Sequence, residues 1–282
     1  MVIVNLRIDF GPSFLKNTMK KLLTISLLTL SILAYAQDFE GTITWTINTD
    51  IKDPKMKAQM KDPAVQAEMK QMQEQMNDPQ MKAMMESNPQ MKAQMEKMMK
   101  MAASGDMNDM MPKGMVIKIK NQNMLTHMDG GMMDGDILYL NDKGQSYHLD
   151  RENKTYSLMP KTGDNEKDAK VTKMSESATI LGYSCTKYKV EMTEQGKKIT
   201  QYLWATTELK GIDMKRMASQ KMNGGNPVFY REIEGVPLKM QMTMPEMEMT
   251  MEVKDIKRES LPAKEFAIPS DFQEVNTPFR GN

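Results

Sequence analysis

The sequence lacks most of the residue types on which disulfides, zinc sites and common catalytic centres depend. Its 282 residues include one cysteine, two histidines and only 6% aromatic residues. A single cysteine excludes an intramolecular disulfide, and we expect Cys185 to behave as a small buried apolar residue. His127, His148 and Cys185 are too scattered in the sequence to give the ligand spacing of a zinc site. Glycine-rich phosphate loops, GxSxG elbows and paired metal-binding histidines are missing too, so the sequence predicts no enzyme.

Long apolar runs are also scarce. The one extended run, residues 22–33, is too short to cross a bilayer, which takes about 20 residues. It follows Met19-Lys20-Lys21 and precedes Ala34-Tyr35-Ala36, which together form the three parts of a secretory signal peptide. We therefore expect residues 1–36 to be a signal peptide, with Met19 as the true start, cleavage before Gln37, and a periplasmic or secreted product.

No charge of one sign dominates the chain. Removing residues 1–36 takes away four basic residues and one acidic residue, which changes the formal net charge from +1 to −2. This balance argues against a nucleic-acid partner, because such partners select strongly basic surfaces. The mature chain, residues 37–282, has no further apolar run and no cysteine at the cleavage site, so we expect neither a transmembrane segment nor a lipid anchor there. We predict that it forms a single β-rich domain.

Methionine takes the place of the missing aromatic residues. The chain has 35 methionines, and no Phe, Tyr or Trp occurs between residues 46 and 138. In this region Asp or Asn precedes proline four times, and each pair is typical of a capped helix start. The pairs predict helices over residues 63–76 and 89–103, with shorter helical turns at 54–61 and 79–86. We interpret residues 53–113 as a Met-rich helical insertion after the first strand.

The rest of the chain alternates apolar and polar residues with the two-residue period of a β-strand. Short turns separate the runs, a pattern typical of an antiparallel meander. We also expect a helix over residues 206–222. The predicted strands cover residues 39–47, 115–119, 124–128, 137–140, 146–149, 155–159, 179–181, 185–192, 199–204 and 228–233.

One hairpin between residues 238 and 253 is unusually rich in methionine. If Pro245-Glu246 is a two-residue loop, the paired positions sum to 491, so that Met242 faces Met249 and Met240 faces Met251. This register places eight apolar side chains on one face of the hairpin. A shift by one residue would move all of one strand's apolar side chains to the other face. The eight residues are Leu238, Met240, Met242, Met244, Met247, Met249, Met251 and Val253.

Four segments resemble a known family. They are "DFEGTITWTI", "ILGYSCTKYKVEM", "QYLWATTELKG" and "EFAIPSDFQEV", which together sample most of the mature chain outside the insertion. They are similar to a secreted Gram-negative family catalogued as a domain of unknown function, which is similar in outline to the LolA-like periplasmic lipoprotein carriers. The resemblance implies an α+β, mainly antiparallel fold, either an incomplete β-barrel or a curved sheet, with helices as a lid. It implies no established activity.

Methionine also suggests what the domain binds. Its unbranched, flexible thioether side chain packs around different apolar partners. We expect a non-enzymatic binding module for a lipid, acyl chain or apolar peptide in a Met-lined concavity. The same residues could instead form ordinary core, or the module could be a structural or protein-interaction element of the cell envelope. Binding to the membrane surface is disfavoured, because the insertion has no aromatic anchors. The candidate ligand-binding residues are Trp45, Leu238, Met240, Met242, Met244, Met247, Met249, Met251, Met69, Met72, Met91 and Met95.

The remaining hypothesis is a metal site. Thioethers are soft ligands that suit Cu(I) or Ag(I). Five candidate ligands fall close together near Gly130, Gly131 and Gly135, although methionine is abundant enough here for such clusters to arise without a metal. We expect no other cofactor. The five candidates are Met124, His127, Met128, Met132 and Met133.

Overall fold

The structure is a computed structural model with two compact units, residues 1–38 and residues 39–282. It describes residues 38–59, 62–76, 78–80, 82–83, 95, 99, 106–131, 135–159, 169–194, 197–212 and 232–275. The predicted signal peptide, its proposed start at Met19 and the cleavage site before Gln37 lie outside the described residues. The description below therefore concerns the second unit.

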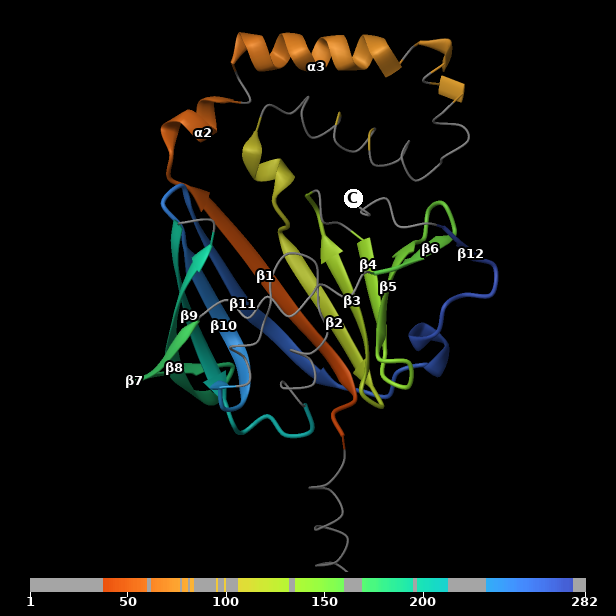
Figure 1. The fold of residues 1–282 in the computed structure, drawn as a ribbon. Coiled ribbons are helices and arrows are strands. Elements are labelled where there is room, and N and C mark those ends of the chain that lie inside the picture. The colour runs from red at the N-terminus through yellow and green to blue at the C-terminus, as the bar shows by residue number, and fades with distance from the viewer. Residues whose placement is uncertain are drawn as a thin grey trace, which may run out of the picture. The chain divides into compact units, whose positions relative to one another are not determined.

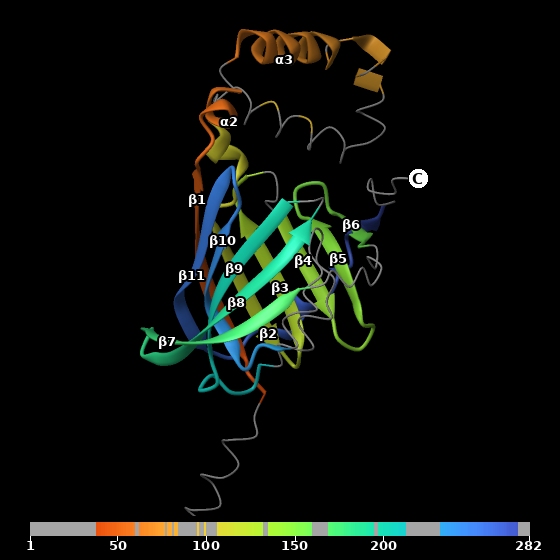
Figure 2. The same cartoon turned by 60° about the vertical axis from the view of Figure 1, so that its left-hand side comes forward.

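One twelve-stranded sheet makes up most of this unit, and it twists and curves along its width (Figures 1 and 2). Its strand order is β12-β6-β5-β4-β3-β2-β1-β11-β10-β9-β8-β7. Neighbouring strands are antiparallel, except that β12 pairs with β6 in parallel. The strands are β1 (Gly41–Ile51), β2 (Gly114–Lys120), β3 (Asn123–Asp129), β4 (Gly135–Leu140), β5 (Gln145–Asp150), β6 (Thr155–Leu158), β7 (Lys170–Ile180), β8 (Tyr183–Glu194), β9 (Lys197–Thr206), β10 (Val236–Thr243), β11 (Met247–Arg258) and β12 (Gln273–Glu274).

Most predicted strands are present, and the mainly antiparallel fold is confirmed. Two expectations were wrong. Strand β7 begins at Lys170 rather than residue 179, because this edge strand is largely exposed and polar and so has no apolar alternation to reveal it. Residues 207–212 form bends instead of the start of a helix, and the rest of that predicted helix lies outside the described residues. The strand predicted at 228–233 also falls almost wholly outside them.

Among the described residues, the Met-rich region contains the helices α2 (Pro54–Gln59) and α3 (Pro63–Met76) and the 3-10 helix η1 (Met107–Met110), and residues 79–80 and 82–83 are helical as well. Their starts follow the predicted chemistry, since a carboxylate oxygen of Asp53 accepts from the Lys55 N–H at 2.7 Å. The Asp62 carboxylate accepts from the Ala64 N–H at 2.8 Å in the same way. The predicted helix over residues 89–103 lies outside the described residues, apart from Met95 and Met99. The whole region joins β1 to β2. These two strands pair directly with each other, and Thr46 and Gly114 form the pair nearest the insertion.

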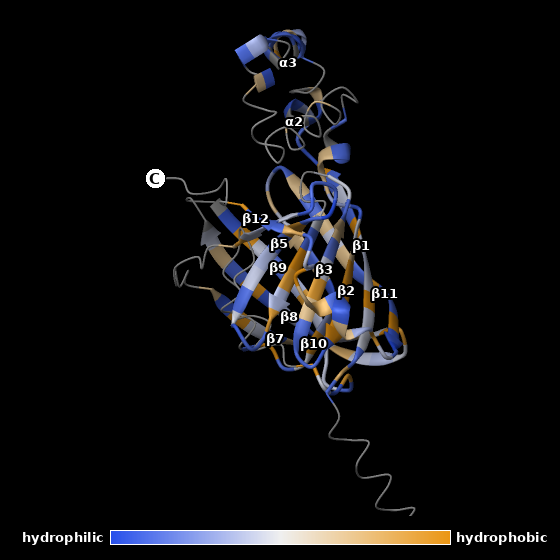
Figure 3. Cartoon of the chain, turned by 90° about the vertical axis from the view of Figure 1, so that its right-hand side faces the viewer, coloured by the Kyte–Doolittle hydropathy of each residue, from blue (hydrophilic) through white to orange (hydrophobic). Residues whose placement is uncertain are grey.

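The sheet has two apolar faces. We call one the Trp45 face, because Trp45 lies on it in a row with its cross-strand partner Met115 and the next partner, Met128. We call the other the Leu138 face, because Leu138 lies on it between its partners Leu125 and Tyr147. Apolar and polar residues alternate along the strands between these faces (Figure 3).

A C-terminal segment closes the Leu138 face. Residues 259–275 include a 3-10 helix, η3 (Ala263–Phe266), and the short strand β12. Leu261 and Phe266 from this segment are buried in one cluster with Leu138 and Leu149. The chain therefore supplies its own cover for this face of β3–β6.

Candidate functional site

The methionine hairpin β10–β11 has the predicted register. Met240 pairs with Met251 and Met242 with Met249. The loop is the predicted two-residue turn, closed by a hydrogen bond of 2.9 Å from the Met244 N–H to the Met247 carbonyl oxygen. The eight apolar residues therefore share the Trp45 face, since Met251 also pairs with Ile47 of β1.

Burial changes along this hairpin. Leu238 and Val253 are buried in the main apolar cluster. Met240, Met249 and Met251 pack against that cluster but are only half-buried. The methionines nearest the turn, Met242, Met244 and Met247, are half-buried as well. The hairpin thus passes from closed core at one end to partly accessible methionine at the other.

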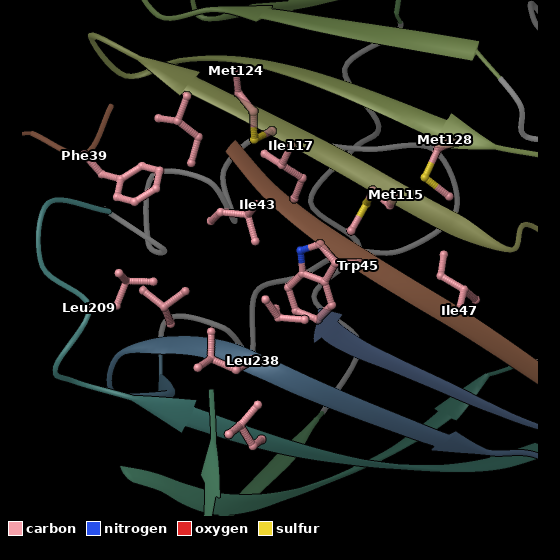
Figure 4. Packing of buried hydrophobic residues seen from close by; sticks show 14 of the residues in the cluster. Phe39, Ile43, Trp45, Ile47, Met115, Ile117, Met124, Met128, Leu209 and Leu238 are labelled. Carbon is pink, nitrogen blue, oxygen red and sulfur yellow. The ribbon is translucent and has the colours of Figure 1, made fainter. Parts of the chain in front are cut away.

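Trp45 lies at the centre of the cluster. Figure 4 shows its indole between Met115 and Leu238, with Met128 beyond Met115. Trp45 is 6% exposed, and Met115 and Met128 are 8% and 7% exposed. One flexible thioether, Met115, is therefore the direct cross-strand neighbour of the largest side chain of this face, and a second, Met128, follows it on the next strand.

The Trp45 face also contains polar atoms that lack partners. Among the described residues, four buried side-chain polar atoms have no hydrogen-bond partner: Trp45 Nε1 and the hydroxyl oxygens of Thr49, Thr126 and Thr155. A buried polar group normally has a partner, because leaving it unpaired costs about 1–3 kcal/mol. Sequence analysis missed the three threonines, although their position in the strand alternation would have placed them on this face.

Not all the candidate ligand residues can be placed. Met69 and Met72 belong to α3, but their side chains, like the whole of Met91, lie outside the described part of the chain. Met95 is half-buried. The lid predicted from these helices therefore stays a prediction.

The metal candidates are divided between the two faces. Met124 and Met128 are buried on the Trp45 face, four residues apart on a strand, which separates their Cα atoms by about 13 Å. His127 points to the opposite face, where its Nδ1 lies 2.7 Å from a carboxylate oxygen of Asp136. Arg151 also binds Asp136 through its Nε. Met132 and Met133 lie outside the described residues, so the structure does not bring the five candidates together.

Cys185 is fully buried, as predicted. Burial raises the pKa of its thiol above the ordinary value of 9.0, which keeps the group neutral near pH 7. Its Sγ contacts the Tyr183 carbonyl oxygen at 3.6 Å. Its role is that of a small apolar core residue.

An ionic clamp holds the C-terminal segment where it leaves the sheet. A carboxylate oxygen of Glu40 accepts from Lys120 Nζ at 2.6 Å and from the Leu261 N–H at 2.7 Å. These two donors hold the pKa of Glu40 below its ordinary value of 4.5. Lys118 and Glu265 form a second ion pair at 2.6 Å between β2 and η3.

The chain belongs to the family described as Domain of unknown function (DUF4412), which matches residues 84–272. This confirms the family predicted from the sequence segments. The matched range leaves out β1 and its segment "DFEGTITWTI", although β1 pairs with matched strands on both sides. No curated protein matches the chain.

Several solved structures are weakly similar. LprF from Mycobacterium bovis has 7% identity over 83% of this chain and 90% of its own, with a TM-score of 0.31. The lipoprotein LppX from Mycobacterium tuberculosis has 7% identity over 79% of this chain and 89% of its own, with a TM-score of 0.30. An uncharacterized conserved protein from Thermus thermophilus has 12% identity over 58% of this chain and 82% of its own, with a TM-score of 0.33. Within the described residues, no helix is long and apolar enough to cross a membrane.

Proposed function

We propose that the protein is an exported, non-enzymatic binding module that takes an apolar ligand, such as a lipid or acyl chain, on the Trp45 face. The observation that carries this proposal is the half-buried end of the methionine hairpin. Six methionines from Met240 to Met251 share one face there without becoming fully buried. Methionine is the side chain best able to repack around apolar molecules of different shape.

The surroundings of the hairpin support an apolar ligand. On the Trp45 face, the residues of β1 from Ile43 to Ile51 are uncharged. Their register partners on β2, β3, β10 and β11 are uncharged too. A ligand with an apolar chain would therefore displace no buried ion pair when it enters. Burial of such a chain supplies about 0.8 kcal/mol for each methylene group.

The Met-rich region between β1 and β2 is the proposed cover of this site. It leaves the sheet after Ile51, whose partner Met247 lies beside the hairpin turn. It therefore begins next to the half-buried methionines. We propose that this region is a helical insertion whose methionine stripes contact the ligand or close over it.

A dye-binding titration of the mature chain tests the proposal. The uncharged dye N-phenyl-1-naphthylamine should bind with enhanced fluorescence, and added lipid should displace it. Changing both Met242 and Met249 to Glu places two charges on the face and should weaken dye binding at least tenfold. Because both residues are only half-buried, the fold should survive, which circular dichroism can check.

A matched control lies one residue away. Thr250→Glu adds a charge to the opposite face of β11, where Thr250 pairs with Gln241. This variant should bind the dye as the unchanged protein does. Equal loss in both variants, or no dye binding by the unchanged protein, would contradict the proposed function.

A further inference from the structure

We propose that the Trp45 face recognises an uncharged acyl ligand through a polar subsite, in which the Trp45 indole N–H and the Thr126 hydroxyl bind the ligand's carbonyl group. This inference rests on the proposed function and adds the chemical class of the ligand. A pure hydrocarbon would leave both groups unpaired. A ligand carbonyl would provide the acceptor that they lack.

The unpaired polar atoms lie on one face of the sheet. Thr49 shares the Trp45 face because it is four residues along β1, an even number of steps. Thr126 pairs with Ile117, which pairs with Ile43, so it lies on the same face. All four unpartnered atoms of the described residues, including the Thr155 hydroxyl, fall on this face.

Thr155 reaches the same face through β4 and β5. Thr126 pairs with Ile137, Ile137 with His148, and His148 with Ser157, two residues from Thr155. The Leu138 face also buries polar atoms, but Asp136 there is bound by His127 and Arg151. The contrast indicates that the Trp45 face is built to meet polar atoms from outside the chain.

Trp45 and Thr126 lie near each other on this face. Thr126 is fully buried and Trp45 nearly so. Thr126 lies two strands away from Trp45 and two residues further along the strand direction, so their Cα atoms are about 12 Å apart. Figure 4 shows the indole nitrogen on the ring edge nearer Ile117, the residue beside Thr126. The indole thus extends across part of that separation, toward the threonine.

The strands around Trp45 place no Lys or Arg beside it on this face. No Lys or Arg lies on the Trp45 face of β1, β2 or β3 between Ile43 and Ile51 or among their register partners. A carboxylate buried beside Trp45 would have no Lys or Arg of these strands to balance it, which is strongly unfavourable. An ester or amide carbonyl accepts the same hydrogen bonds without that cost. The subsite therefore favours a neutral acyl derivative over a free fatty acid.

Entry of a ligand requires the side chains around Trp45 to move, and the two methionines next along its cross-strand row are suited to this. Met115 and Met128 lie in one cross-strand row with Trp45. Each has several rotatable bonds and packs adaptably. Their displacement would open space beside the indole while leaving the strands in place.

The test compares methyl laurate with n-tetradecane, which match in chain length, as displacers of N-phenyl-1-naphthylamine from the mature chain. The measured quantity is the Kd of n-tetradecane divided by the Kd of methyl laurate. This ratio is compared between the unchanged protein and each variant, so that differences in solubility between the two ligands cancel. In Trp45→Phe and in Thr126→Val, the preference for the ester should fall about tenfold. Thr44→Val, the same change on the Leu138 face, should leave the ratio unaltered.

Stability provides a second measurement. Because Thr126→Val removes an unpaired hydroxyl without changing the side-chain shape, the melting temperature of the free protein should stay constant or rise. A lower melting temperature with an unchanged ester preference would show that the hydroxyl is structural and would overturn the inference.

The outcomes also separate this inference from the proposed function. If ester and alkane both displace the dye but no variant changes their ratio, the polar subsite is wrong and the apolar site stands. If neither displaces the dye, the proposed function fails and this inference fails with it. Trp45 is one of two tryptophans, so it is the remaining one in the variant Trp204→Phe. With no dye present, the Trp45 emission of this variant should shift when methyl laurate is added. It should not shift when laurate is added at the same concentration.

Discussion

The two faces of the sheet both bury apolar side chains, but they do so with different residue types. The Leu138 face uses Leu and Tyr residues and is covered by Leu261 and Phe266 of the C-terminal segment. The Trp45 face uses Ile and Met around one tryptophan, and it changes from closed core to half-buried methionine along the hairpin. Branched and aromatic residues specify one packing, whereas methionine permits several. Apolar content alone therefore does not distinguish a core from a binding surface.

Polar groups sharpen the same contrast. On the Leu138 face, the buried carboxylate of Asp136 has two partners, His127 and Arg151. On the Trp45 face, the described polar side chains include four buried atoms without any partner. A finished core satisfies its polar groups, because each failure costs stability. The unsatisfied groups therefore mark the face whose contents the chain does not fully supply.

The largest expected effect comes from truncating one side chain on each face. Leu138→Ala should lower the free energy of unfolding by about 2–5 kcal/mol, because it leaves a cavity in a fully buried cluster. Met249→Ala removes a half-buried side chain and should cost about 1 kcal/mol. Urea unfolding followed by circular dichroism measures both. Equal costs would remove the distinction between the two faces.

A smaller loss of stability is expected when the contact between Glu40 and the C-terminal segment is weakened. Glu40→Gln weakens the hydrogen bonds to Lys120 and Leu261 and should lower the unfolding midpoint at pH 7. Because the folded-state pKa of Glu40 lies below its ordinary value of 4.5, its contribution is present above that value and is lost as pH falls through the lower, folded-state pKa.

The difference between Glu40→Gln and the unchanged protein should therefore disappear toward low pH. Urea midpoints measured from pH 7 down to pH 3 follow this change. Glu259→Gln is a suitable control, since Glu259 is exposed and accepts from Thr42 instead. A difference that persists unchanged at pH 3 would contradict the assigned role of the Glu40 carboxylate.

The smallest effect on stability is expected from removing the Met-rich region. Replacing residues 53–112 by a short glycine linker should leave the unfolding midpoint of the sheet nearly unchanged, because β1 and β2 pair directly. Dye binding to the Trp45 face should weaken if this region covers the site. Loss of the folded sheet in this variant would contradict the interpretation of residues 53–113 as an insertion.

Much of the strand pattern could be predicted from the sequence, because alternation has a fixed period and turn residues delimit it. The hairpin register followed from the two-residue loop and the eight apolar positions, of which Met240 and Met251 are one confirmed pair. Strand β7 was largely missed, because an exposed polar edge strand has no apolar alternation. The metal candidates looked close only because sequence spacing ignores the alternation that turns His127 away from Met124 and Met128.

The sequence by itself determined most of the strands, where α3 begins, and how β10 and β11 pair, since all of these depend on neighbouring residues. Only the tertiary structure decided that Glu40 meets Leu261 and that the C-terminal segment covers the Leu138 face. It also decided that Trp45 and Thr126 share a face without polar partners. These relations join residues distant in sequence, and they depend on strand order and register, which local patterns do not encode.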